Sequence, residues 1–335
     1  MDRRALCLVA FILVCACGRN EEPGKAAQAP PAATTFRIGL LGHGMAPSDA
    51  ELAAGDFMVA MRDLGYVEGA NLTVESRFAR GNVDRLPDLA TELVRKGVDM
   101  IVTFGEPSAL AAKRATSAIP ILATELTLDP VKSGLVANLA RPEGNITGLT
   151  TQNDELWQKR MFVFKQIVPK ASRIAVFWNP VNPGNTSCVD EIKAAAPALG
   201  LQISLQEVRD SDAIERAFVA IAKERPDGLA TCWDSVTLAH ARAIADFAVK
   251  QRLPTLAPIR EYVEAGSLMS LGMSLPAHRR RAAHYVDKVL KGTKPSALPV
   301  ERPLQFDLVI NVGTAKALGL VPPSATLVLA DDLIR

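Results

Sequence analysis

Short apolar runs alternate with segments of helical spacing along most of the chain, and this alternation strongly limits the possible folds. Val98 to Lys113 shows the unit: an apolar run ends at Phe104, Gly105 to Ser108 interrupts it, and helical composition follows. The pattern predicts a strand, a tight loop and a helix. Such a loop places the N–H groups of a helix's first turn at the carboxyl end of a strand, where an open α/β sheet usually holds its ligand.

The unit recurs in two series. We expect strands at Phe36–Leu41, Leu72–Arg77, Asp99–Phe104 and Pro120–Ala123, then at Arg173–Trp178, Gln202–Gln206, Gly228–Thr231 and Thr255–Ala257. We expect helices at Leu52–Leu64, Asp84–Lys96, Ala109–Arg114, Glu155–Val168, Cys188–Leu199, Asp212–Glu224 and Thr237–Gln251. This order is the signature of parallel sheets with helices on both faces. Asn145 to Gly148, between the series, reads as a turn at a crossing.

The last part of the chain is too short for a third domain. It holds a strand pattern at Gly266–Leu271, a helix at Ala277–Leu290, a strand at Leu304–Asn311 and a short helix at Thr314–Leu318. These elements fit best as chain passing back between two lobes. We therefore expect an α/β protein with two doubly wound parallel-sheet lobes and a multi-strand hinge, lobe 1 being 36–148 plus about 272–298 and lobe 2 being 149–271 plus about 304–335.

The N-terminus has the pattern of an export signal. Arg3 and Arg4 precede an apolar run from Ala5 to Ala16, which is too short to span a bilayer. The run ends in a sequence similar to a bacterial lipobox, so residues 1–16 are expected to be cleaved and Cys17 lipidated; an ordinary secretory signal is the alternative. Residues 17–35, rich in Ala, Pro, Gln and Gly, are expected to form a flexible tether. We expect a lipoprotein anchored at the cell envelope and facing the periplasm.

Charge and composition exclude several functions. The net charge of +2 and the lack of an aromatic-interleaved basic stripe give no reason to expect nucleic acid. No CxxC or HExxH spacing lies outside the signal, so neither a metal nor a cofactor is expected. Cys188 and Cys232 lie in different predicted contexts, and sequence alone does not show whether they meet, so both are treated by default as buried or partly buried thiols. Arg279 to Arg281, in a predicted amphipathic helix, are interpreted as a solvated face.

Several long segments resemble the substrate-binding lipoproteins of a bacterial ABC-transporter family that includes proteins linked to uptake of tryptophan and other aromatic amino acids. They are LGYVEGANLTVESRFARGN (64–82), IPILATELTLDPVKSGLVANLARPEGNITGLT (119–150), AGSLMSLG (265–272), RRAAHYVDKVLKGTKPSALPVERPLQFDLVINVGTAKALGL (280–320) and the closing ADDLIR. The resemblance implies a type I periplasmic-binding-protein fold that delivers a small ligand to the transmembrane subunits of an ABC permease as a monomer. It implies no enzymatic activity.

The chain departs from that family at three places. Glu106 stands where a small residue or Thr is common, Leu271 where an aromatic residue is common, and Ala265 to Ser267 where paired glycines are common. A carboxylate at a helix N-terminus competes with an anionic ligand group for the same N–H donors. The departures argue against a simple transfer of aromatic amino-acid specificity and predict a cationic ligand group near Glu106.

The candidate ligand contacts lie just beyond the predicted strand ends. They are Gly42, His43, Gly105, Glu106, Ser108, Thr124 and Glu125 in lobe 1, and Asn179, Trp233, Asp234, Ser235 and Arg260 in lobe 2. Ser108 can donate to a ligand carboxylate, Glu106 or Asp234 can accept from an ammonium group, and Trp233 can stack.

Structural roles compete with each of these assignments. Glu106 and Ser108 can simply begin a helix, Asp234 can cap the helix that follows it, and Trp233 can belong to the core. Two other functions also compete: an exported lipoprotein that reports its ligand to a membrane sensor, and an exported α/β hydrolase. Against the hydrolase, the chain has no GxSxG elbow, no P-loop and no complete GxGxxG after a strand.

Overall fold

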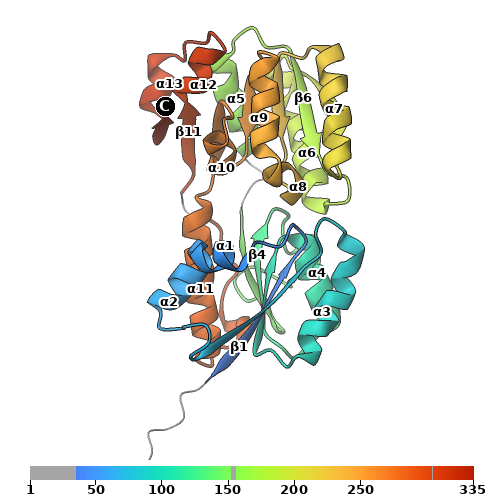
Figure 1. Ribbon diagram of the computed structural model, residues 1–335, viewed down its shortest axis with the longest axis vertical. Coiled ribbons are helices and arrows are strands. Elements are labelled where there is room, and N and C mark those ends of the chain that lie inside the picture. The colour runs from blue at the N-terminus through green and yellow to red at the C-terminus, as the bar shows by residue number, and fades with distance from the viewer. Residues whose placement is uncertain (1–34, 152–155, 304) are drawn as a thin grey trace, which may run out of the picture. The chain divides into compact units, whose positions relative to one another are not determined.

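Two separate sheets organise the protein in the computed structural model, which describes residues 35–151, 156–303 and 305–335. Figure 1 shows each sheet in its own lobe. The first sheet has the strand order β2-β1-β3-β4-β5 and is parallel throughout. Its strands are β1 (Phe36–Gly42), β2 (Leu72–Phe78), β3 (Met100–Phe104), β4 (Ile121–Leu126) and β5 (Ile146–Thr150).

The second sheet has the order β12-β11-β10-β9-β8-β6-β7 and is parallel except where β10 meets β11. Its strands are β6 (Arg173–Trp178), β7 (Gln202–Glu207), β8 (Gly228–Thr231), β9 (Thr255–Ala257), β10 (Met269–Gly272), β11 (Asp307–Asn311) and β12 (Asp332–Ile334). The antiparallel pair marks the place where the chain returns to lobe 2 from lobe 1.

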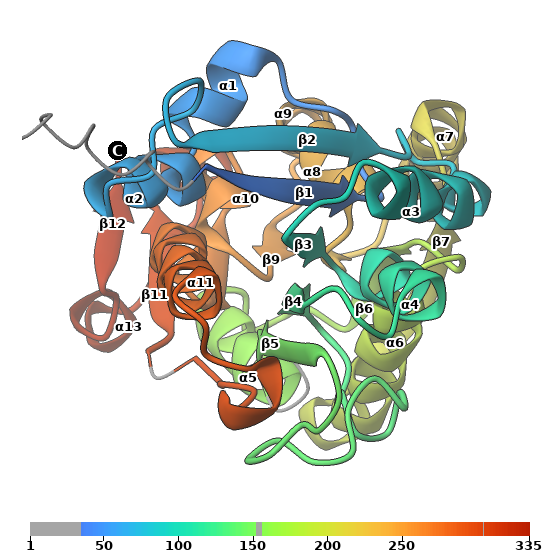
Figure 2. The same cartoon turned by 90° about the horizontal axis from the view of Figure 1, so that it is seen from below.

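Helices cover both faces of the first sheet. They are α1 (Asp49–Ala54), α2 (Asp56–Asp63), α3 (Leu86–Arg95), α4 (Glu106–Ala115) and, from the C-terminal part of the chain, α11 (Leu275–Leu290), with the 3-10 turns Val83–Arg85 and Pro295–Ala297. Figure 2 shows α2 and α11 on one face and α3 and α4 on the other. Each pair closes a separate apolar core against β1, β3 and β4.

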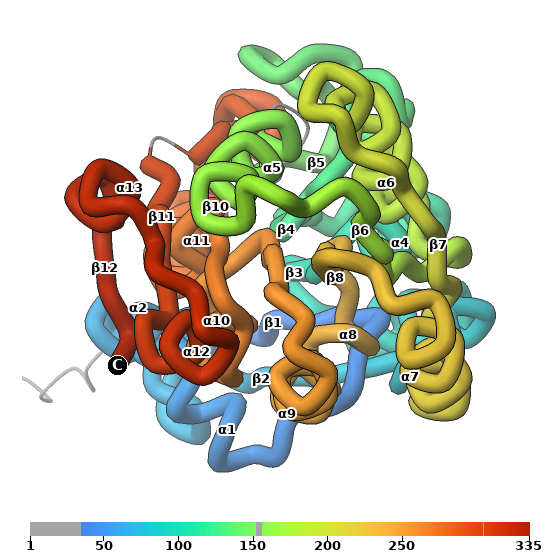
Figure 3. Tube along the Cα trace, turned by 90° about the horizontal axis from the view of Figure 1, so that it is seen from above, coloured from blue at the N-terminus to red at the C-terminus, as the bar shows by residue number. Residues whose placement is uncertain are grey.

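The second sheet is covered in the same way. Its helices are α5 (Leu156–Ile167), α6 (Pro183–Ala195), α7 (Ser211–Glu224), α8 (Ser235–Ala239), α9 (Ala241–Lys250), α10 (Arg260–Glu264), α12 (Val312–Ala317) and α13 (Ser324–Val328), with the 3-10 turn Pro197–Leu199. In Figure 3, α5 and α6 lie on one side and α7 and α9 on the other. The predicted fold class of two doubly wound α/β lobes is therefore confirmed.

The chain crosses between the lobes three times, after β5, after β10 and before β11. Before the last crossing, Glu301 forms an isolated parallel β-bridge with Leu149 of β5. Three separate segments of the chain therefore connect the two lobes.

The expected turn at Asn145 to Gly148 is wrong, because residues from Ile146 onward form the edge strand β5. All five residues of β5 are buried, and Thr147 Oγ1 donates to the carbonyl of Leu298 at 2.8 Å. A side chain at Gly148 would meet the carbonyl of Ala123, 2.5 Å from its Cβ. The segment that was expected to be a turn instead packs closely against β4, because Gly148 has no side chain.

Helix boundaries also differ from the expectation. Helix α6 begins five residues before the expected Cys188, because Asn182 caps it through Gly184 N and Pro183 occupies its first position. The expected helix 237–251 starts earlier, at Ser235, and divides into α8 and α9 at His240; the expected helix 52–64 is divided at Gly55. Glu155, Leu304 and the N-terminal signal and tether lie outside the described residues.

The two remaining cysteines are not free thiols. Cys188 on α6 and Cys232 after β8 form a disulfide, with Cα atoms 6.1 Å apart. The expectation failed because β8 and α6 meet only through the fold of lobe 2, which residue spacing does not reveal.

Candidate functional site

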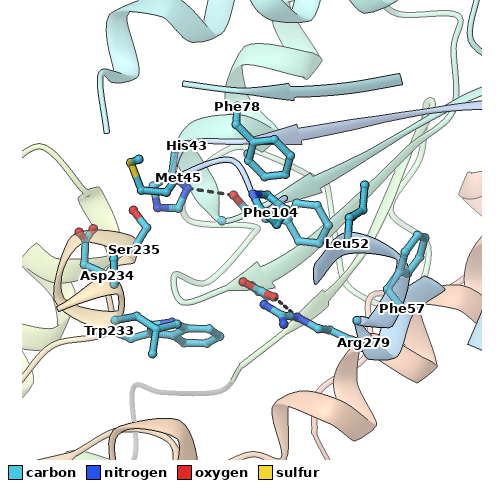
Figure 4. A pocket seen from close by; sticks show the side chains of 18 of the residues that line it. His43, Met45, Leu52, Phe57, Phe78, Phe104, Trp233, Asp234, Ser235 and Arg279 are labelled. Atoms are coloured by element: carbon cyan, nitrogen blue, oxygen red, sulfur yellow. Dashed lines mark hydrogen bonds and ion pairs between the residues drawn. The ribbon is translucent and has the colours of Figure 1, made fainter. Parts of the chain in front are cut away.

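A cavity of about 360 Å³ lies where the carboxyl ends of strands from both sheets face each other. Lobe 1 contributes the loops after β1, β3 and β4, the end of β2 and part of α1 and α2. Lobe 2 contributes Asn182 after β6 and the segment after β8, and α11 contributes one side chain. Figure 4 shows Trp233 on one side of this space and Phe78, Phe104 and Leu52 on the other. Ligands of open α/β sheets bind at this edge.

Eight of the candidate residues line this cavity. They are Gly42, His43, Gly105, Glu106, Glu125, Trp233, Asp234 and Ser235. Residues that directly follow parallel strands gather at one edge of a sheet, which is why the strand pattern places these eight together. Their contact with a ligand stays a prediction.

Three other candidates lie beneath the cavity wall. Ser108 is fully buried in the first turn of α4, and Thr124 Oγ1 donates to the carbonyl of Thr103 at 2.7 Å. Asn179 is buried, and its Nδ2 donates to Asp234 Oδ1 at 3.2 Å. These side chains support the residues that line the cavity and are not among its lining.

Arg260 is the one candidate that the structure places elsewhere, because it is not part of the cavity lining and its side chain is engaged at the sheet edge. It begins α10 and forms ion pairs at 2.6 Å with Glu264 on the same helix and with Asp332 on the edge strand β12. The nearby carboxylates direct the guanidinium toward the sheet edge and away from the ligand space.

The apolar lining is more aromatic than the sequence suggested. The rings of Phe78 and Phe104, the last residues of β2 and β3, stack at 6.5 Å between centroids with 14° between their planes. Phe57, Leu52 and Met45 extend the same wall. The sequence analysis placed Phe104 at the end of a strand and Phe78 directly after the strand expected at Leu72–Arg77, and it named neither as a ligand contact. Their place at the carboxyl ends of strands was the available signal.

The main charged group in the cavity is an ion pair. Arg279 Nε, on α11, donates to Glu125 Oε1, on β4, at 3.1 Å. Glu125 adopts a left-handed conformation with φ 57° at a register shift between Ala123 and Leu126. Its backbone N–H donates to His278 Nε2 at 3.2 Å. Two neighbouring residues of α11 thus hold both the backbone and the carboxylate of Glu125 in a conformation that non-glycine residues seldom adopt.

The side chains of Arg279, Arg280 and Arg281 are 37 %, 61 % and 42 % exposed, as expected for a solvated face, but each also pairs with a carboxylate. Arg279 reaches the cavity, and the charge of Glu125 raises its pKa. Arg280 pairs with Asp56 at 3.1 Å, and Arg281 donates to the two carboxylate oxygens of Glu301 through Nε and Nη2. The acidic partners come from distant segments, so the triplet alone gave no sign of them.

Glu106 lines the cavity, but its carboxylate already has protein partners. Oε1 accepts from Leu128 N at 2.6 Å, and Oε2 accepts from Thr127 Oγ1 at 3.1 Å. Only 3 % of the residue is exposed, and this burial raises its pKa while the hydrogen bonds act in the opposite direction. The carboxylate therefore joins the first turn of α4 to the loop after β4.

Asp234 and His43 are held in a similar manner. Asp234 caps α8 through Val236 N at 2.9 Å and accepts from Asn182 Nδ2 at 2.9 Å. His43 Nδ1 lies 3.0 Å from the carbonyl of Phe104, so Nδ1 carries the proton in that hydrogen bond. Both side chains shape the cavity while fixing the loops that bear them.

Trp233 is supported from behind. Its neighbour Cys232 is bonded to Cys188 of α6, and Asn185 Nδ2 from the same helix donates to the carbonyl of Trp233 at 2.8 Å. The aromatic wall of lobe 2 is therefore attached to α6 by a covalent bond and a hydrogen bond.

In ranges 35–151, 156–303 and 305–335, no group of three His, Cys, Asp or Glu side chains is arranged to hold a metal ion. No helix in those ranges has the length and apolar character needed to cross a membrane.

Comparison with known proteins agrees with this architecture. A curated tyrosine-binding protein from Clostridioides difficile (strain R20291) is 27 % identical over 269 residues, which cover 80 % of this chain and 77 % of the relative. A conserved domain protein from Vibrio cholerae has a solved structure with a TM-score of 0.81 and 28 % identity, covering 90 % of this chain and all of that one. The solved structure of an ABC domain from Streptococcus pneumoniae in complex with L-Trp has a TM-score of 0.80 and 22 % identity, covering 90 % of this chain and all of that one. This similarity shows the shared fold.

The family model described as ABC transporter substrate binding protein matches residues 47–334, nearly the whole described chain. Members of this family bind small ligands such as amino acids and are exported to the periplasm or cell surface. The matched range contains the strand-end loops and the α11 arginine that line the cavity, apart from the β1 loop. The chain belongs to the family of ABC transporter substrate-binding proteins.

Proposed function

We propose that this protein binds an amino acid with an aromatic or other large apolar side chain and delivers it to an ABC permease. The observation that carries the proposal is the position of Arg279, whose guanidinium reaches the cavity beside the carboxylate of Glu125. Its hydrogen bond to Glu125 uses Nε. The terminal nitrogens form no further hydrogen bond within the described residues, and a guanidinium binds a carboxylate through such a pair of N–H groups.

The ligand ammonium group would bind Glu125. One carboxylate oxygen of Glu125 accepts from Arg279, and the other remains to accept from a ligand cation. Neighbouring groups of opposite charge suit a zwitterion, because each ligand charge meets a partner without a net charge being buried. The ammonium and carboxylate of an amino acid have this arrangement.

The ligand side chain would lie between the Phe78–Phe104 pair and Trp233. These rings give two apolar walls on opposite sides of the cavity. Flat aromatic groups gain about 0.5–1.5 kcal/mol from such ring contacts beyond their apolar burial. The relatives whose names mention tyrosine and L-Trp support this class of ligand. Glu106 does not oppose it, because its carboxylate is engaged with Thr127 and Leu128.

Membrane attachment belongs to the same proposal. Lipidation at Cys17 with a tether over residues 17–35 would keep the two lobes near the permease; residues 17–34 lie outside the described part of the chain. Metabolic labelling with a fatty acid tests this point. Wild-type protein should incorporate the label, and Cys17→Ala should not.

A thermal-shift screen over amino acids, small peptides and organic acids tests the ligand class. A ligand at a hundredfold excess over its dissociation constant should stabilise the protein by about 2.7 kcal/mol. Aromatic amino acids should shift the melting temperature most, and their decarboxylated amines should shift it little. Stabilisation by amines and not by amino acids would contradict the assignment of Arg279.

A further inference from the structure

The first turn of α6 lies directly against lobe 1. Gly184, its second residue, belongs to lobe 2, and a Cβ there would overlap Thr127 Oγ1 of lobe 1 and stand 3.3 Å from Glu106 Oε2. Thr127 is fixed by its hydrogen bond to Glu106. The absence of a side chain at Gly184 therefore allows the two lobes to approach to this distance.

The same turn of α6 is connected to the ligand wall. Asn182 Nδ2 donates to Asp234 Oδ2 at 2.9 Å, and Asn185 Nδ2 donates to the carbonyl of Trp233 at 2.8 Å. Thr127, Glu106 and Asn182 all line the cavity. The contact between the lobes at Gly184 thus adjoins the site and is continuous with the segment that carries Trp233.

A second glycine forms a similar contact on another loop. Gly44, after β1, approaches Ser235 at the start of α8 so closely that its Cβ would lie 2.7 Å from Ser235 Cβ. Both residues line the cavity. Contacts of this kind at two loops bring both lobes together around the ligand space.

We propose that Gly184 and Gly44 are the closure contacts of this protein, and that Glu106 with Thr127 forms the lobe 1 surface on which α6 docks. Closure then depends on side-chain volume at two positions where the lobes meet. Glu106 acts through Thr127 as a positioning residue: its carboxylate holds the hydroxyl in place and lies near the positive N-terminus of a 13-residue helix. This inference goes beyond the proposed function and does not depend on which ligand is bound.

The test measures the distance between the lobes directly. Spin labels are attached at cysteines replacing Arg114 on α4 and Asp190 on α6, both exposed, in protein lacking residues 1–34, so that Cys188 and Cys232, bonded to each other, are the only native cysteines. Distance distributions are recorded in buffer and with L-tyrosine or L-tryptophan. In the wild-type background a short distance should be populated in at least one of these conditions.

Gly184→Ala should lower the population of the short distance about tenfold or more, because a methyl group must overlap Thr127 on closure. Thr186→Ala is the matched control: it lies in the same turn of α6 but is exposed, and should leave the distribution unchanged. Thr127→Ala removes the obstructing hydroxyl, so adding Gly184→Ala in that background should have a much smaller effect.

Three results would overturn the proposal. Gly184→Ala could retain the wild-type distribution, Thr127→Ala could fail to reduce its effect, or the wild type could lack the short distance in every condition. The rescue by Thr127→Ala also separates a steric effect on closure from damage to the fold. Failure of the ligand assignment would appear differently, as wild-type closure that no amino acid changes.

Discussion

Glu106 is the residue at which sequence and structure give the most different chemistry. A carboxylate beginning a helix at a strand end suggested a partner for a cationic ligand group. The structure instead engages both oxygens with Thr127 and Leu128. Its position at the cavity was predictable from the strand-loop-helix pattern, but its partners come from the next loop and were not.

Replacing Glu106 with Gln should therefore affect stability more than ligand choice. The amide nitrogen would face one of two donors that now bind the carboxylate, so we expect a loss of about 1–3 kcal/mol in the free energy of unfolding. Denaturant unfolding measures this loss, with the exposed Glu207→Gln as control. A changed ranking of neutral and cationic ligands, with stability unaffected, would show that Glu106 contacts the ligand.

His278 gives a pH dependence. Burial lowers the pKa of His278 from 6.5 to about 4. In the folded protein the neutral ring accepts the backbone N–H of Glu125 through Nε2. The unfolded state thus binds more protons than the folded state between these values, so stability is complete above pH 6.5 and decreases as the pH falls toward 4. The free energy of unfolding should fall by about 3 kcal/mol over this range because of His278.

Unfolding of the wild type and of His278→Gln across this range checks the prediction. Glutamine can accept the same N–H but does not titrate. The stability of His278→Gln should therefore fall less than that of the wild type, by about 3 kcal/mol. Identical pH profiles for the two proteins would mean that His278 is not held neutral by burial.

At the scale of elements, the order of strands and helices could be predicted because apolar period and turn residues act locally. The start of α6 and the strand β5 could not. Pro183-Gly184 reads as a turn until Asn182 is seen to cap the helix, and β5 needs a partner strand and the carbonyl of Leu298 to be stable. Local pattern does not include such tertiary partners.

The disulfide joins two elements whose proximity also came only from the fold. It closes a segment with a sequence separation of 44 residues, which corresponds to roughly 4 kcal/mol of unfolding free energy in the chain-entropy description. The Cys188→Ala/Cys232→Ala variant should lose about 2–4 kcal/mol in denaturant unfolding. Reduced wild-type protein should show the same loss, and equal stability of the reduced and oxidised forms would contradict a bond in the folded protein.

At the scale of the whole molecule, the chain crosses three times between two lobes, and the cavity lies where the strand ends of the lobes face each other. The lobe boundaries proposed from the sequence depend on where each crossing begins, and these remain predictions. The α11 helix explains why: it follows a strand of lobe 2 directly yet packs on lobe 1, where Arg279 reaches the cavity and His278 holds Glu125. A residue so far along the chain from the lobe 1 loops gave no local signal of a role there.

Titration calorimetry on Arg279→Ala and Arg280→Ala tests the central claim most directly. Both residues lie side by side on α11, but only Arg279 lines the cavity, while Arg280 pairs with Asp56. With L-tryptophan and L-tyrosine, Arg279→Ala should weaken binding about 10- to 150-fold, since a hydrogen bond to a charged group contributes about 1.5–3 kcal/mol. Arg280→Ala should bind like the wild type. Equal affinities for both variants, or no binding of either amino acid to the wild type, would contradict the account.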